Sequence, residues 1–517
     1  MPEVVERPQR ISLHYFSAWF INKTKSINMK DGSGRRRKAA ATLTVVWSST
    51  VVLHLVSGGS WLVLGLTAML GIHALRVMFA RPRSMPAPLP YPSQSSLDKE
   101  PRTRQEYDQW PYVSILVASK NEEAVVQRLV NNLCTLDYPK HRYDVWMIDD
   151  NSTDATPKIL QSLAKTYENL NIVCRTPGAG GGKSGALNEV WPQTKGDLIA
   201  VFDADAQVPT DLLCRVVPLF TEADRASVGA VQVRKAIANA STNFWTQGQA
   251  SEMMLDAYFQ QQRISIGGIG ELRGNGQFVR RTALADCKGW NELTITDDLD
   301  LTLKLHINDW DIDLLAYPAV QEEGVTAIQG LWHQRNRWAE GGYQRYLDYW
   351  RPIVQNRLGP QKSLDLLAFC MTQYIIPTAA LPDLVISLLR GRLPLLSPLT
   401  TLTILLSFIG IFLGTKRVHA QQIPLQPSNN LPYPPTKAAP MLPQKGNTNA
   451  SWNIVGAIGE AIRGTLYMAH WFIVIVSMTI RLSIRPKRLK WVKTVHHGAS
   501  LPNPLTDGLE SGTSSDL

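Results

Sequence analysis

Long apolar segments at both ends of the chain constrain its fold more than any other feature. Residues 41–57 and 61–80 flank a Gly-Gly-Ser turn, and each is close to the ~20 residues that a helix needs to cross a bilayer. Residues 393–414 are uncharged, as are residues 464–480. We therefore predict an integral, multi-pass membrane protein with an N-terminal transmembrane hairpin and two later spans. The alternative for the hairpin is a pair of buried helices in a soluble domain.

Basic residues beside these segments predict which side of the membrane the chain ends occupy. Residues 1–40 carry nine Lys or Arg against three acidic residues, and residues 481–493 carry six with no acid, in a chain of net charge +10. Such flanks favour the cytoplasmic side and anionic lipid. Because an even number of spans keeps both ends inside, we expect residues 364–389, with two Asp and two Pro, to form an interfacial or broken element. No nucleic-acid motif accompanies either basic block, so we expect no nucleic acid partner.

The middle of the chain has a different character. A mean hydropathy of −0.11 excludes a protein that lies mostly in lipid, and about 240 residues separate the apolar ends. The predicted segments are a basic cytoplasmic N-terminal segment (1–40), a transmembrane hairpin (41–80), a linker (81–111), an enzyme-like domain (112–350), an interfacial helix with C-terminal transmembrane helices (364–482, the spans at about 393–414 and 464–482, with a Pro-rich loop at 416–450) and a basic cytoplasmic tail (483–517).

Strands and helices alternate repeatedly within this middle domain. The predicted strands are residues 113–119, 144–149, 171–176, 198–202, 228–234 and 312–317. Helices are predicted at 121–134 and 155–167. Short apolar strands that alternate with helices predict an α/β fold with a mainly parallel sheet covered on both faces. In such sheets the reactive side chains gather just beyond the carboxyl ends of the strands.

Acidic residues follow several of these strands. The second predicted strand runs into Asp149 and Asp150, and the fourth runs into Asp203 and Asp205. Two carboxylates this close repel each other unless a cation neutralises them. Mg²⁺, or Mn²⁺ as an alternative, held by one or two carboxylates and by substrate phosphates would do so. For a single such pair an Asx turn or a helix cap is the simpler explanation, but the repetition within one domain favours the cation.

Two further segments carry candidate polar groups. Residues 178–188 form a Gly-rich loop with Lys183, whose exposed backbone N–H groups would suit phosphate, although a flexible surface turn is an equal alternative. Asp297 and Asp298 open an acidic run. An acid beside a bound sugar can act as general base for a hydroxyl, but taken alone this segment is better explained as the Asp-rich first turn of a helix. Residues 332–338 combine Arg, Gln and Trp, which suit phosphate, a sugar face or the bilayer interface.

Taken in order, these segments resemble the family-2 inverting glycosyltransferases with a GT-A fold, in the membrane-bound, cellulose-synthase-like branch. The resemblance covers roughly residues 112–350. The motifs that carry it are SKNEE at 119–123, IDDNSTD at 148–154, GGKSGALN at 181–188, DAD at 203–205, GNGQFVRR at 274–281, TDD at 296–298 and QRNRW at 334–338. The family usually has Glu where Asp297 stands. Seven motifs in the family's order make the resemblance strong.

The resemblance implies roles for single residues around the donor. Asn121, Glu122 and Asp150 would lie around the base and ribose of the nucleotide, and Lys183 near the nucleotide or its diphosphate. Asp203 would serve the diphosphate and its divalent cation.

It also implies the metal ligand, the base and the acceptor end. Asp205 would be the more direct ligand of the cation, with Asp203 beside it, and Asp298 would be the general base. The residues that would line the acceptor and diphosphate end are Gln334, Arg337 and Trp338. A single base without a carboxylate nucleophile fits one in-line displacement with inversion.

The sequence constrains the acceptor substrate less than any other part of the predicted function. The predicted spans are few for the walls of a tunnel that would hold a polymer. The FxVTxK segment of bacterial cellulose synthases is also absent from the sequence. The whole arrangement and the basic segment at 484–498 are similar to cyanobacterial glycolipid-forming members of the family. That similarity implies UDP-glucose as donor, 1,2-diacylglycerol as acceptor, and a plasma or thylakoid membrane location with the catalytic domain cytoplasmic. A processive β-polysaccharide synthase and a non-catalytic membrane scaffold remain as alternatives.

Overall fold

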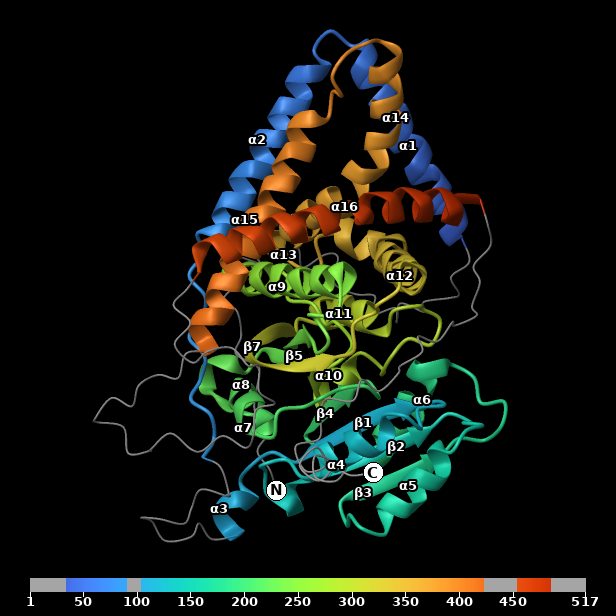
Figure 1. Cartoon of the computed structure of the whole chain (residues 1–517), viewed down its shortest axis with the longest axis vertical. Helices are drawn as coiled ribbons and strands as arrows, with labels where there is room; N and C mark the ends of the chain where they lie inside the picture. Colours follow the sequence, from blue (N-terminus) through green and yellow to red (C-terminus); the bar gives the residue numbers. More distant parts are fainter. Residues whose placement is uncertain (1–33, 91–103, 423–452, 485–517) are drawn as a thin grey trace, which may run out of the picture.

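The structure is a computed structural model that describes residues 34–90, 104–422 and 453–484. A sheet domain forms one end of the molecule, a layer of helices covers it, and long apolar helices extend from that layer to the other end (Figure 1). Most of the predicted N-terminal segment, Pro-rich loop and basic tail, with part of the linker, lie outside the described residues.

Seven strands form one mixed, mostly parallel sheet in the order β3-β2-β1-β4-β6-β5-β7. Their bounds are β1 Val113–Ser119, β2 Tyr143–Asp149, β3 Leu170–Cys174, β4 Leu198–Phe202, β5 Val228–Ile237, β6 Gln277–Arg280 and β7 Asp311–Glu322. Only β6 runs against its neighbours. Each of the six predicted strands is present, and the predicted α/β, GT-A type of sheet is confirmed.

Helices cover both faces of this sheet, as expected for buried apolar strands. Their bounds are α3 Arg104–Asp108, α4 Val126–Cys134, α5 Thr156–Ala164, α6 Gly182–Val190, α7 Leu212–Val216, α8 Pro218–Thr221, α9 Phe244–Ser265, α10 Arg281–Asp286, α11 Asp297–Ile307 and α12 Ile328–Val354. One apolar cluster lies on each face. The helix predicted at 121–134 begins later, at Val126, because Asn121 has a left-handed φ of 55° that a helix cannot include.

The apolar ends of the chain form long helices. Their bounds are α1 Arg35–Leu55, α2 Gly59–Met78, α13 Pro360–Cys370, α14 Ile376–Leu389, α15 Ser397–Gln422 and α16 Ile454–Ile484. A π turn at Met371–Ile375 joins α13 to α14, so the predicted broken element is helical with one irregular turn. Within the described parts of the chain, five helices are long and apolar enough to cross a membrane, and Pro360–Leu389 is one of them.

These helices do not all run in the same direction. Two of them, α2 and α15, lie side by side along the long axis of the molecule, and α1 and α14 lie side by side opposite them. In contrast, α16 runs across this direction and packs against α1, α14 and α15 (Figure 1). Two glycines let α15 approach α9 closely. A Cβ at Gly410 would lie 2.5 Å from Phe259 Cε2, and one at Gly414 would lie 2.9 Å from the Met254 carbonyl oxygen. Such small residues allow helix backbones to pack at short distance.

Candidate active site

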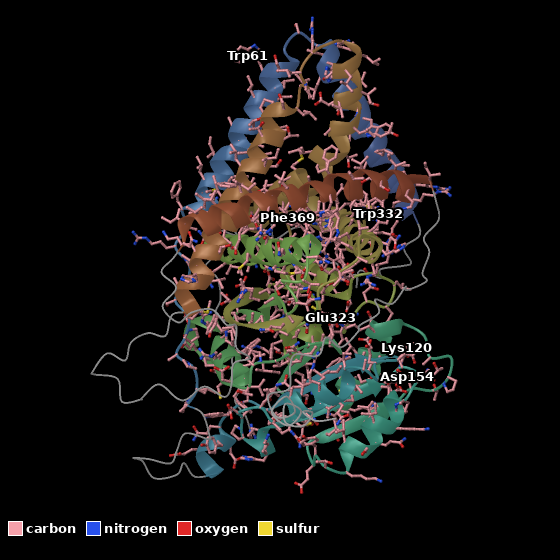
Figure 2. All side chains as sticks on the ribbon, viewed as in Figure 1. Trp61, Lys120, Asp154, Glu323, Trp332 and Phe369 are labelled. Carbon is pink, nitrogen blue, oxygen red and sulfur yellow. The ribbon has the colours of Figure 1, made fainter. Side chains whose placement is uncertain are left out.

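A cavity of about 1600 Å³ lies between the carboxyl edge of the sheet and the long helices. Pockets for one drug-sized ligand hold about 300–1,000 Å³, so this cavity has room for two substrates. Lys120, Glu323 and Phe369 all line it, and Figure 2 shows them following one another from the sheet domain up to the helical layer. Nine of the ten predicted site residues line this cavity; they are Glu122, Asp150, Lys183, Asp203, Asp205, Asp298, Gln334, Arg337 and Trp338.

The ends of β1 and β2 place the first acidic residues. These strands are parallel neighbours with Ser119 opposite Asp149, so the loops that follow them meet at one edge. Asp150 accepts a hydrogen bond of 2.6 Å from Arg175 Nη1, which fixes its carboxylate. Asn121 is the predicted residue that does not line the cavity: its Oδ1 accepts from the Thr153 backbone N–H at 2.7 Å and so ties the two loops together.

The Gly-rich loop delivers Lys183 to the acidic group. Gly181 and Gly182 have φ values of 79° and 54°, which only glycine adopts readily, and α6 begins there. Lys183 Nζ donates to Asp203 Oδ1 at 2.5 Å. Burial lowers the pKa of Lys183, but the carboxylates of Asp203 and Asp297 outweigh it and raise that pKa above its ordinary value. A charged ammonium therefore faces the cavity.

Asp203 and Asp205 differ in exposure and support. The Asp203 side chain is 41% exposed, and its backbone N–H donates to Asn275 Oδ1 at 3.2 Å. Asp205 is buried, and its Oδ2 accepts from the Glu323 backbone N–H at 3.0 Å. Among the described residues no three His, Cys, Asp or Glu side chains form a complete metal site. The pair fits a hard divalent cation that takes its remaining ligands from substrate phosphates and water.

Asp298 lies in the first turn of α11, as the helical explanation predicted, and it also lines the cavity. The Leu299 backbone N–H donates to Asp298 Oδ1 at 2.8 Å. Burial, followed by repulsion from Asp297, raises the pKa of Asp298 to about 6. A carboxylate with this pKa is ionised at neutral pH and basic enough to accept a proton from a reacting hydroxyl.

One face of α12 supplies the last three predicted residues. Burial lowers the pKa of Arg337, and the negative charges of Asp203 and Asp298 act in the opposite direction. The Arg337 guanidinium therefore interacts electrostatically with these acids and offsets part of their negative charge. The Arg335 guanidinium carbon lies 4.0 Å from the centroid of the Trp338 ring, and Lys235 Nζ lies 5.1 Å from the same centroid. Gln334 Oε1 accepts from Arg335 Nη1 at 3.1 Å.

Several cavity residues were missed by sequence reasoning. Lys235 and Glu322 line the cavity as a pair 3.3 Å apart, because β5 and β7 extend beyond their predicted ends. Arg273 and Asp256 form a second lining pair at 2.7 Å. Arg273 follows no predicted strand, but it stands immediately before the GNGQ motif, and that position was the signal available.

Comparison with known proteins agrees with this geometry. The model of the family described as glycosyltransferase like family 2 matches residues 111–341. A β-monoglucosyldiacylglycerol synthase from Nostoc sp. is 57% identical over 90% of each chain. One from Synechocystis sp. is 52% identical over 91% of this chain and 90% of its own.

A solved structure aligns more weakly. The mannosyltransferase of Pyrobaculum calidifontis in complex with GDP-Man and Mn²⁺ aligns with 74% of this chain and 99% of its own, at 19% identity and a TM-score of 0.47, a likeness too low to carry an argument about ligands. The sequence identity to the two cyanobacterial proteins, 57% and 52%, is far higher than this 19%. The chain belongs to glycosyltransferase family 2 and, within it, to the family of the β-monoglucosyldiacylglycerol synthases.

Proposed function

We propose that this protein transfers glucose from UDP-glucose to the free hydroxyl of 1,2-diacylglycerol, with inversion at the anomeric carbon. The observation that carries the proposal is one cavity that joins a cluster of Asp, Lys and Arg side chains to apolar helices. The charged part suits a sugar nucleotide, and the apolar part suits a lipid. The name of the relatives that are more than 50% identical to this chain, β-monoglucosyldiacylglycerol synthase, supports a glucosyl diacylglycerol as the product.

The proposed chemistry is a single displacement. The lipid hydroxyl attacks the anomeric carbon, the bond from that carbon to the β-phosphate oxygen breaks, UDP leaves, and the hydroxyl proton passes to Asp298. Lys183 and Arg337 hold the diphosphate and stabilise its growing charge. A divalent cation at Asp203 and Asp205 would supply further stabilisation of that charge.

Glu122 and Asp150 would contact the nucleotide from the first two strand ends, and Asn121 would support them by holding the second loop. Gln334 and Trp338, on α12, would line the acceptor side of the sugar. The Trp338 ring is held by cation–π contacts with Arg335 and Lys235.

The arrangement of the helices supports a topology in which α1, α2, α14 and α15 cross the bilayer. In this proposal α16 lies at the cytoplasmic interface, because it runs across the other helices (Figure 1) and carries Glu460 and Arg463 in its first half, where lipid would disfavour them. Four spans keep both chain ends and the catalytic domain on the cytoplasmic side, as the basic flanks predict.

The test is an assay of the detergent-purified full chain with UDP-[¹⁴C]glucose, diacylglycerol and Mg²⁺. We expect label in a chloroform-soluble glycolipid with a β linkage, and loss of that label in EDTA that added Mg²⁺ or Mn²⁺ restores. Label in ethanol-insoluble polymer would show a polysaccharide synthase instead. Absence of any product with UDP-glucose, but product with another UDP-sugar, would overturn the donor assignment.

The raised pKa of Asp298 predicts the pH dependence of the reaction. Since protonated Asp298 cannot accept the hydroxyl proton, kcat/KM should fall as the pH drops through about 6. Replacing Asp297 with Asn removes a neighbouring negative charge, which lowers the pKa of Asp298 and should move this acid limb to lower pH. The measurement is kcat/KM for diacylglycerol from pH 4.5 to 8.5. An acid limb that stays in place in Asp297→Asn would contradict the assignment.

A further inference from the structure

The cavity continues from the charged site into a crevice between two of the long helices. One face of α2 lines it with Leu70, His73, Ala74 and Val77, and the neighbouring helix α15 lines it with Thr403, Leu406 and Ser407. The 3–4 residue spacing on each helix shows that a single stripe of each faces inward. The neighbouring residues Ile72 and Ile404 point outward, with exposures of 69% and 56%.

The inner end of this crevice carries a polar group with an unused donor. Arg263 on α9 is buried and lines the cavity. Its Nε donates to Asp365 Oδ2 at 2.8 Å, and its Nη1 donates to Glu271 Oε2 at 3.4 Å. The buried Nη2 has no hydrogen-bond partner among the described residues. A buried guanidinium donor without a partner costs free energy, so a ligand acceptor at this point would satisfy it.

The sequence of charged, polar and apolar groups along the cavity therefore matches the sequence of groups along a diacylglycerol molecule. Carboxylates and cations come first, then the Arg263 guanidinium, then the walls of α2 and α15, which are apolar apart from His73, Thr403 and Ser407. In 1,2-diacylglycerol the free hydroxyl is followed by ester carbonyls, which only accept hydrogen bonds, and then by acyl chains. The Arg263 guanidinium carbon lies over the Phe369 ring, 4.6 Å from the ring centroid, and Figure 2 shows Phe369 in the helical layer above the sheet domain.

We propose that the acceptor lipid reaches the site sideways from the bilayer through the crevice between α2 and α15, and that Arg263 Nη2 donates to one of its ester carbonyls. This inference rests on the proposed function and adds the route and the pose of the acceptor. It makes Arg263 a positioning residue for the hydroxyl rather than a catalytic one.

The first experiment blocks the crevice from each wall. Ala74→Trp and Thr403→Trp place an indole inside it, and Ile72→Trp and Ile404→Trp add the same side chain to the outer faces of the same helices as matched controls. We expect kcat/KM for dioleoylglycerol to fall by about tenfold or more in the two inner variants and to stay near wild type in the controls. Dibutyrylglycerol, whose chains are too short to need the crevice, should be affected much less.

UDP binding measured by calorimetry shows whether each variant is folded, since the donor end of the cavity is unchanged. Inner variants that bind UDP and use dioleoylglycerol as well as their controls do would overturn the route. So would an equal loss with long and short acceptors. If the wild-type protein uses no diacylglycerol, the proposed function itself fails, and the two failures are thereby distinguished.

The second experiment tests the ester contact without changing Arg263, whose replacement would disturb the buried ion pairs around it. A 1,2-dialkylglycerol keeps the chains and the hydroxyl but lacks both carbonyl oxygens. We expect the wild-type KM for this ether analogue to exceed that for the matched diacylglycerol by about tenfold, as for loss of a hydrogen bond to a charged group, with kcat changed less. Equal KM values would overturn the Arg263 contact.

Discussion

Replacing Asp298 with Asn should reduce kcat by about 10²–10⁴-fold, the range in which a general base contributes. Asn keeps the size and the hydrogen bond from the Leu299 N–H but cannot accept a proton. The measurement is glucolipid formation at saturating substrates, with UDP binding by calorimetry as a second readout. UDP affinity should remain within a few-fold of wild type, since the nucleotide end of the cavity is lined by other residues.

The matched control is Asp309→Asn. Asp309 is exposed, follows the same helix, and has a φ of 61°, a conformation that Asn tolerates well. Its activity should equal that of wild type. Retention of normal turnover in Asp298→Asn would show that another group removes the proton and that the role given to this acid is wrong.

The parts of the fold and site that sequence reasoning predicted are those set by local patterns. β1, β2 and β4 are mainly apolar segments followed at once by polar residues, so both the strands and the acidic edge could be predicted directly. Asp150 and Asp203 line one cavity because β2 and β4, which they follow, flank β1 in the sheet, whereas Asp298 reaches the same cavity from the first turn of α11. The resemblance to the glycosyltransferase family supplied the roles of these residues, which local patterns do not contain.

The parts that were missed depend on tertiary packing. The carboxyl ends of β5 and β7 lie at Ile237 and Glu322, beyond the apolar runs, since they pair with each other where the sequence is already polar; Lys235 was therefore not recognised. The role of α9 was invisible for a different reason. Its residues Asp256, Gln260 and Arg263 line the cavity, in a position set by the packing of α9 against α15 at Gly410 and Gly414, which no local pattern reports.

Hydropathy also could not predict how each long helix is oriented relative to the others. The stretch at 364–389 and the last apolar helix have similar hydropathy, but the first turns upward as α14 and the second lies across the others as α16 (Figure 1). Contacts with the catalytic domain, which no local window reports, produce this difference.

One buried carboxylate holds the two halves of the cavity together. Glu271 is fully buried and accepts hydrogen bonds from Arg345 Nη1 at 2.5 Å, Arg273 Nη2 at 2.6 Å and Arg263 Nη1 at 3.4 Å. Burial alone would raise the pKa of Glu271, but the three guanidinium groups outweigh it and hold that pKa well below its usual range. Because the folded-state pKa is depressed, the stabilisation is present at neutral pH and is lost only in strong acid.

Glu271→Gln should therefore destabilise the protein by about 3–5 kcal/mol, the cost of breaking a buried charge network. Glu222→Gln is the matched control, because Glu222 is 46% exposed and lies 3.7 Å from Arg225; exposed pairs contribute about 0–1 kcal/mol. Thermal unfolding of the two variants in the same detergent measures the difference. Arg273 faces the donor end and Arg263 the acceptor end, so the folded fraction of Glu271→Gln should also show higher KM values for both substrates. Equal unfolding temperatures for the two variants would mean that the three guanidinium groups find other partners, and that the cavity does not depend on this carboxylate.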